Sequence, residues 1–112
     1  MVQNIIKFLV NGFAVYSTAY LLSGVSLTSF YVALLVALVL TILNLLVRPV
    51  LLVLSLPINI LTLGLFTFVI NALIVIIATK IVPGFEVNSF WDALLFSIVL
   101  AIISSVLNWI IG

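Results

Sequence analysis

The charged side chains of this sequence are few and lie far apart. Among 112 residues, only Lys7, Arg48, Lys80, Glu86 and Asp92 carry a charge. No charge interrupts the long segments between Lys7 and Arg48 or between Arg48 and Lys80. A soluble domain has roughly 25% charged residues, and a small one must cover a large surface with polar groups. With 4% charged and 68% hydrophobic residues, the chain is predicted to use the lipid bilayer as its main solvent.

The residue types that the sequence lacks narrow its chemistry. Histidine and cysteine are both absent, which excludes zinc, haem and thiolate sites, an imidazole base and disulfides. The net charge of +1 offers no basic patch that could neutralise nucleic-acid phosphates. Glu86 and Asp92 are the only carboxylates, and the sequence shows no nucleophile or base to act with them. We therefore expect no enzyme activity, no catalytic or metal site, no cofactor and no nucleic-acid partner.

Four apolar stretches are long enough to cross a membrane as helices. An α-helix needs about 20 apolar residues to span the roughly 30 Å hydrocarbon layer. The stretches of this length are 4–22, 30–48, 58–82 and 90–111. Turn residues at 23–29 separate the first two stretches, and turn residues at 83–89 separate the last two. We predict an all-α, integral membrane fold with four transmembrane helices, in a single transmembrane domain over residues 1–112.

A proline follows the second stretch. Pro49 lacks a backbone N–H and its ring blocks the preceding turn, so we expect it to kink or end the second helix. Residues 50–57 then form either a helical extension or a short segment at the membrane interface. The sequence leaves both conformations open.

Offsetting the sequence by 60 residues aligns many identical positions. Several belong to residue types that are scarce in this chain: Asn11 with Asn71, Gly24 with Gly84, and Ser29-Phe30 with Ser89-Phe90. We predict an internal repeat of two tandem helical hairpins, about 4–49 and about 64–109. Each hairpin has an even number of spans, so both have the same orientation and their pseudo-axis runs along the membrane normal.

The first stretch has an alternative interpretation. Lys7, the apolar residues after it and Ser17-Thr18-Ala19 also fit a cleaved signal peptide. In the repeat, however, this stretch is the partner of the third one. We therefore expect it to be a transmembrane helix, because its removal would leave the first hairpin incomplete.

Basic and aromatic residues predict the topology. Lys7 and Arg48 lie on one side of the predicted helices and Lys80 on the other. The Lys/Arg excess faces the cytoplasm, so both termini are expected to be cytoplasmic. Trp91 and Trp109 are 18 residues apart, or about 27 Å along a helix, which places them at opposite interfaces. We expect Arg48, Lys80, Trp91 and Trp109 to anchor the helices at the membrane interfaces.

Small and polar residues form one line along each predicted helix. In the second stretch Ala33, Ala37, Thr41, Asn44 and Arg48 recur every three or four residues, which is one helical face. We call seven uncharged polar residues of these lines the polar seam: Asn11, Thr41, Asn44, Asn71, Ser97, Ser104 and Asn108. The seam either packs helices together through close approach and hydrogen bonds or lines a polar path, within one copy or between copies.

The start of the fourth stretch has a capping pattern. Ser89 and Asp92 have the Ser-x-x-Asp spacing in which a serine caps the first turn and an acid offsets the positive end of the helix dipole. We therefore expect Ser89 and Asp92 to cap the fourth helix.

Several short motifs occur in the order found in a known family. They are Arg48-Pro49, Leu61-Thr62-Leu63-Gly64, Asn71-Ala72-Leu73 and Val82-Pro83-Gly84-Phe85 leading to Phe90-Trp91. Together they resemble the phage holin family 4 superfamily, small four-helix membrane proteins with chromosomal relatives of the YvlD type. The resemblance covers nearly the whole chain and implies a multi-pass protein of the bacterial cytoplasmic (inner) membrane. The holin name implies homo-oligomers that open holes for a cell-wall hydrolase.

Three functions fit these features. The first is a holin-like protein that oligomerises and permeabilises the cytoplasmic membrane, which predicts leakage. The second is a non-lytic structural or envelope-stress protein that binds another membrane protein through the polar seam, which predicts a co-purifying partner without leakage. The third is a small channel or transporter, for which the sequence shows no buried charge pair that would form a solute site.

Overall fold

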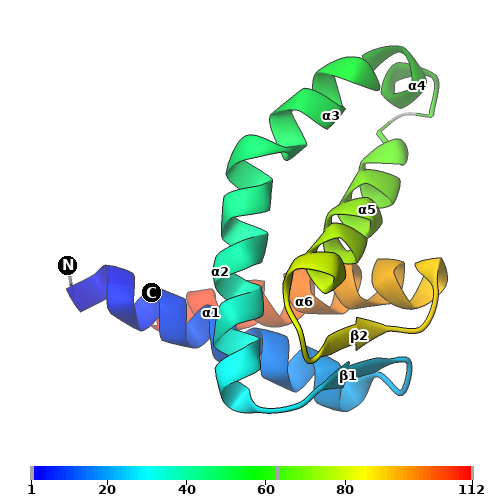
Figure 1. The fold of residues 1–112 in the computed structure, drawn as a ribbon. Helices are drawn as coiled ribbons and strands as arrows, with labels where there is room; N and C mark the ends of the chain where they lie inside the picture. The colour runs from blue at the N-terminus through cyan, green and yellow to red at the C-terminus, as the bar shows by residue number, and fades with distance from the viewer. Residues whose placement is uncertain (1, 63, 112) are drawn as a thin grey trace.

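The computed structural model describes residues 2–62 and 64–111, which form six helices and a two-stranded ribbon (Figure 1). Leu63 of the Leu-Thr-Leu-Gly motif and the two end positions of the predicted domain lie outside the described residues. The elements are α1 (Val2–Leu21), β1 (Val25–Leu27), α2 (Phe30–Leu46), α3 (Arg48–Leu54), α4 (Leu56–Leu61), α5 (Phe66–Ile81), β2 (Phe85–Val87) and α6 (Phe90–Ile111). The predicted helical fold class is confirmed.

The third predicted stretch is the one whose extent was wrong. The sequence predicted one helix over 58–82, but α4 ends at Leu61 and α5 begins only at Phe66. Gly64 lies between them with a φ of +88°, a left-handed conformation that a right-handed helix cannot contain. The 16 residues of α5 therefore rise about 24 Å, less than the roughly 30 Å hydrocarbon layer.

Length and composition single out few membrane-spanning candidates among the described helices. α6 is long and apolar enough to cross a membrane by itself. α2 and α3 qualify as a second candidate when they are taken as one span that is bent by 42°.

The segment after α2 is helical. α3 follows α2 directly, with its axis bent by 42° from that of α2. α4 follows after Ser55. Pro49 and Pro57 lie in the first turns of α3 and α4, where a missing N–H leaves no helical hydrogen bond unmade. Pro49 thus kinks the helix as predicted, and most of residues 50–57 form a helical extension.

The loops of the two hairpins pair with each other. β1 and β2 are antiparallel, with Val25 opposite Val87, Ser26 opposite Glu86 and Leu27 opposite Phe85. Just beyond the strands, the Thr28 N–H donates to Gly84 O and the Asn88 N–H donates to Gly24 O. These segments were predicted as turns only. The apolar-polar-apolar alternation of both strands was the available signal, because a half-buried strand exposes every second side chain.

The helices form two arms that start at the ribbon. α1 packs against α2 and α6, and α5 packs against α6 and α2. One arm consists of α1 and α6, and the other consists of α2 and α5. In Figure 1 the two arms diverge from each other with distance from the ribbon. The N and C ends lie together at the far end of the first arm (Figure 1).

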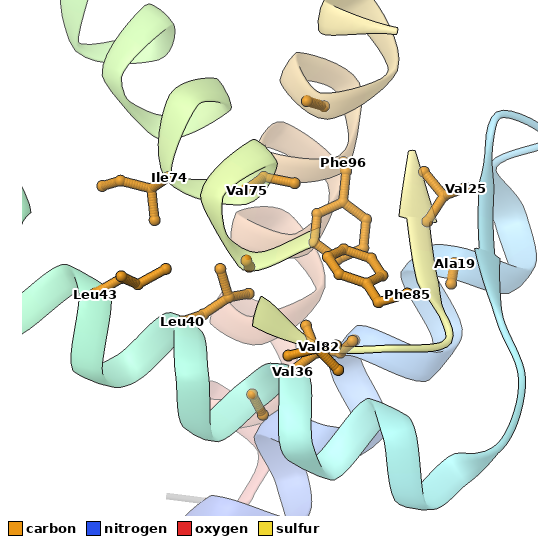
Figure 2. Packing of buried hydrophobic residues seen from close by; sticks show 14 of the residues in the cluster. Ala19, Val25, Val36, Leu40, Leu43, Ile74, Val75, Val82, Phe85 and Phe96 are labelled. Carbon is orange, nitrogen blue, oxygen red and sulfur yellow. The ribbon is translucent and has the colours of Figure 1, made fainter. Parts of the chain in front are cut away.

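The apolar core fills the ribbon end of the molecule. Phe85 and Phe96 are fully buried, and their ring centroids lie 5.3 Å apart. Val25, Val36 and Val82 are buried in the same cluster (Figure 2). Buried Ala33 and Ala93 let helix backbones approach closely here. This end of the bundle is therefore closed by apolar packing.

Candidate functional site

Two cavities lie between the helices, farther from the ribbon than the core. The larger has a volume of about 200 Å³ and is lined by residues of α2, α3, α5 and α6. The smaller has a volume of about 160 Å³ and is lined by residues of α1, α2 and α6. Leu40, Asn44 and Leu100 line both cavities. The two therefore adjoin, and we call them together the polar cleft.

Six of the seven polar-seam residues line the polar cleft. Those around the larger cavity are Asn44, Asn71 and Ser97, and those around the smaller are Asn11, Thr41, Asn44 and Ser104. Asn108 is the exception, because it is exposed near the end of α6 and lines neither cavity. The structure thus brings together, from α1, α2, α5 and α6, side chains that the sequence placed on separate helix faces.

The hydroxyls and amides in the cleft differ in their hydrogen bonding. Thr41 Oγ1 donates to Ala37 O at 2.8 Å, and Ser97 Oγ donates to Leu94 O at 2.8 Å. Such bonds satisfy a hydroxyl within its own helix. The amides of Asn11 and Asn44 have more donors and acceptors to satisfy than a hydroxyl, and neither residue is buried. Asn11 and Asn44 therefore add amide donors and acceptors to the polar surface of this cleft.

Arg48 lies inside the same cleft. Its guanidinium donates a hydrogen bond to Asn71 Oδ1, which connects α3 to α5, and the side chain is half-buried. Glu86 and Asp92, the two carboxylate side chains, lie far along the chain in β2 and in the first turn of α6, at the ribbon end. Arg48 was predicted to anchor the second helix at the membrane interface, and its contact with Asn71 was not predicted. Its helical spacing from Asn44 was the signal that could have found it.

The other predicted site residues lie away from the cleft. Lys80 is exposed in the last turn of α5. Trp91 and Trp109 are 69% and 85% exposed at the two ends of α6. Their exposure leaves them available to lipid, and their role as interface anchors stays a prediction.

Ser89 lies at the start of α6. Its Oγ accepts a hydrogen bond from the Asp92 N–H at 3.2 Å and donates to Asp92 Oδ2 at 3.0 Å. Ser29 stands in the same relation to α2, where its Oγ accepts from the Val32 N–H. Both helices that leave the ribbon thus begin with a serine that satisfies one free backbone donor.

The sequence matches a described membrane-protein family over most of its length. Residues 2–106 match the model described as "Mycobacterial 4 TMS phage holin, superfamily IV". The chain belongs to this family. The resemblance inferred from the ordered motifs is therefore confirmed, and the chain is a holin-like transmembrane protein from a family that is not known for enzymes.

Two relatives extend this finding. The uncharacterised protein SCO3922 of Streptomyces coelicolor is 36% identical, and the match covers 93% of this chain and 91% of that protein. The uncharacterised membrane protein YvlD of Bacillus subtilis is 32% identical, over 91% of this chain and 87% of that protein. No solved structure matches the chain.

The outer surface of the helices agrees with a membrane environment. Large apolar side chains are exposed on every helix, among them Tyr20, Leu45, Leu54, Leu61, Phe68 and Ile110. Such a surface is unfavourable in water, and in lipid it faces acyl chains of similar polarity. The bilayer is therefore the solvent that suits this holin-like protein.

Proposed function

We propose that this holin-like chain lies in the bacterial cytoplasmic membrane, assembles into homo-oligomers and permeabilises the membrane along its polar clefts. The observation that carries the proposal is the convergence of six polar-seam residues on one cleft. Unpaired amides are costly against lipid tails. A cleft of this composition in a membrane protein is suited to contain water or to face the cleft of another copy.

A single copy is closed in this conformation. The cluster of Phe85, Phe96, Val25, Val36 and Val82 fills the ribbon end of the bundle, beside the cleft. Packed apolar side chains leave no space for water. In the proposed mechanism, permeation therefore requires that the clefts of several copies face one another or that the helix arms separate further.

The proposed topology has four membrane crossings with both termini in the cytoplasm. The family description gives four transmembrane segments. Gln3, Ile6 and Lys7 of α1 line one cavity together with Ile111 of α6, and this proximity supports the proposal that both ends lie on the same side of the membrane. An even number of crossings requires this arrangement.

The proposed architecture is one transmembrane domain of two tandem units, about 4–49 and about 64–109. Two features support it. The 60-residue offset exchanges β1 with β2 and preserves their register. The same offset relates residues that line the larger cavity to residues that line the smaller one: Leu40 to Leu100, Asn44 to Ser104, Asn71 to Asn11 and Ser97 to Ala37.

Cysteine labelling tests this topology directly, because the native chain contains no cysteine. Gln3 and Ser26 are both exposed, Gln3 near the N-terminus and Ser26 in the ribbon. In intact cells, a membrane-impermeant maleimide is expected to label Ser26→Cys and to spare Gln3→Cys, while both are labelled after the membrane is opened. Labelling of Gln3→Cys in intact cells would place the termini outside and contradict the proposal.

Asn44 is the residue on which the permeability proposal depends most, because it lines both cavities. We expect induced expression of the native chain in a bacterium to depolarise the membrane. Asn44→Leu replaces an amide by an apolar side chain of similar size and should slow this depolarisation by on the order of tenfold, as expected for the loss of a polar group worth about 1.4 kcal/mol. A potential-sensitive dye measures the rate.

The matched control is Asn108→Leu, which makes the same change outside the cleft. Depolarisation by this variant should equal that of the native chain at equal membrane abundance. Equal slowing by both variants would remove the cleft from the mechanism. An intact potential with abundant native protein in the membrane would contradict permeabilisation and favour the binding of another membrane protein.

A further inference from the structure

We propose that the larger cavity binds the phosphate of an anionic phospholipid headgroup, with Arg48 as its cationic ligand. This binding site goes beyond the permeabilising function, and its test is independent of leakage. Arg48 is the only arginine of the chain. Its guanidinium lies in an interhelical cavity, whereas both carboxylate side chains lie at the ribbon end.

The polar groups of this cavity are mainly donors. Arg48 has no acceptor, so the group that faces it must be the oxygen of the Asn71 amide. This orientation leaves the NH₂ group of Asn71 as a donor, together with the remaining N–H groups of Arg48 and the amide of Asn44. A planar guanidinium with adjacent amide donors matches the oxygens of a phosphate. The cavity therefore offers positive charge and donors to an anion.

The rest of the lining favours a lipid over a soluble anion. Leu40, Ile74, Val75, Leu100 and Ala101 form apolar walls next to the donors. The volume of about 200 Å³ compares with about 30 Å³ for one water molecule in the liquid, so a phosphate and the adjoining carbons fit. Basic pockets between transmembrane helices on the cytoplasmic side are suited to anionic headgroups, and Arg48 lies on the predicted cytoplasmic side.

The smaller cavity provides an internal comparison. The 60-residue offset relates Arg48 to Asn108, and Asn108 lies outside the smaller cavity. The smaller cavity thus has asparagines and hydroxyls without a cation. One strong phosphate site per chain is therefore expected.

The test measures lipid binding to the purified full chain in a neutral detergent. Native mass spectrometry would count phosphatidylglycerol and phosphatidylcholine bound at a series of lipid concentrations. The native chain should prefer phosphatidylglycerol. Arg48→Gln should weaken phosphatidylglycerol binding by tenfold or more, roughly the value of one charge-assisted hydrogen bond. Lys7→Gln removes the same charge outside this cavity and should leave the binding unchanged.

A second variant and a soluble competitor complete the test. Arg48→Lys keeps the charge without the planar fork and should bind phosphatidylglycerol with intermediate affinity. This variant also provides the test if Arg48→Gln does not fold. Equal affinity of the native chain for both lipids, or an equal loss in Lys7→Gln and Arg48→Gln, would overturn the proposal. Displacement of the lipid by glycerol phosphate at similar concentration would identify a soluble phosphate as the ligand and overturn the assignment to lipid.

Discussion

Gly84→Ala is expected to destabilise the protein by about 2–4 kcal/mol, through a left-handed backbone and a steric conflict together. Gly84 has a φ of +90°. A Cβ atom at this position would lie 2.6 Å from Thr28 Oγ1 and 3.3 Å from Val32 Cγ2. The residue also accepts the Thr28 N–H hydrogen bond beside the ribbon, so a shift of its backbone would disturb the pairing of the two hairpins.

Gly64→Ala separates the two causes. Gly64 has a similar φ of +88°, but among the described residues, its chain neighbours apart, none has an atom within 4 Å of where a Cβ would lie. Only the conformational cost of about 1–2 kcal/mol then applies. Unfolding of both variants in mixed micelles, followed by circular dichroism, gives the comparison. If Gly64→Ala were as destabilising as Gly84→Ala, close packing at the ribbon would have no part in the effect.

Phe96→Ala is expected to cost about 2–3 kcal/mol, because the change leaves a void of roughly 100 Å³ at about 24 cal/mol per Å³. Phe96 is fully buried against Phe85. In a bilayer, the free energy of transferring this side chain between the core and the lipid is small, since lipid is as apolar as the core. The cavity term therefore dominates, and it makes the prediction smaller than for the same change in a soluble protein.

Leu95→Ala is the control for this prediction. Leu95 is the neighbour of Phe96 on α6 and is 48% exposed. Its truncation leaves a gap that lipid or detergent can fill, so the same unfolding measurement should show a change below about 1 kcal/mol. A comparable loss at both positions would mean that the ribbon end is not a packed core.

The closed core and the polar cleft occupy successive parts of the same bundle. Leu40 and Leu100 lie where they meet, since both line the two cavities and both belong to the core or pack against it. This division gives the proposed mechanism a concrete requirement. The apolar end must stay packed for the chain to be stable, and the polar end must find water or another copy.

The sequence by itself determined the membrane environment, the helical class and six polar residues of the cleft. Long segments without charge exclude water as the main solvent, and a spacing of three or four residues places side chains on one helical face. These are local properties, so Asn44 and Arg48 could be assigned to one face from their spacing alone. The family motifs are likewise readable from local order along the chain.

The tertiary structure decided which faces meet. The contact of Arg48 with Asn71, the pairing of β1 with β2 and the division of the cleft into two cavities join residues far apart in sequence. The break between α4 and α5 depends on the backbone conformation of Gly64. Hydropathy carries no information on how helices cross, because every lipid-facing side is equally apolar. The arrangement of the arms therefore follows from packing at the ribbon end, where small residues and two phenylalanines fit together.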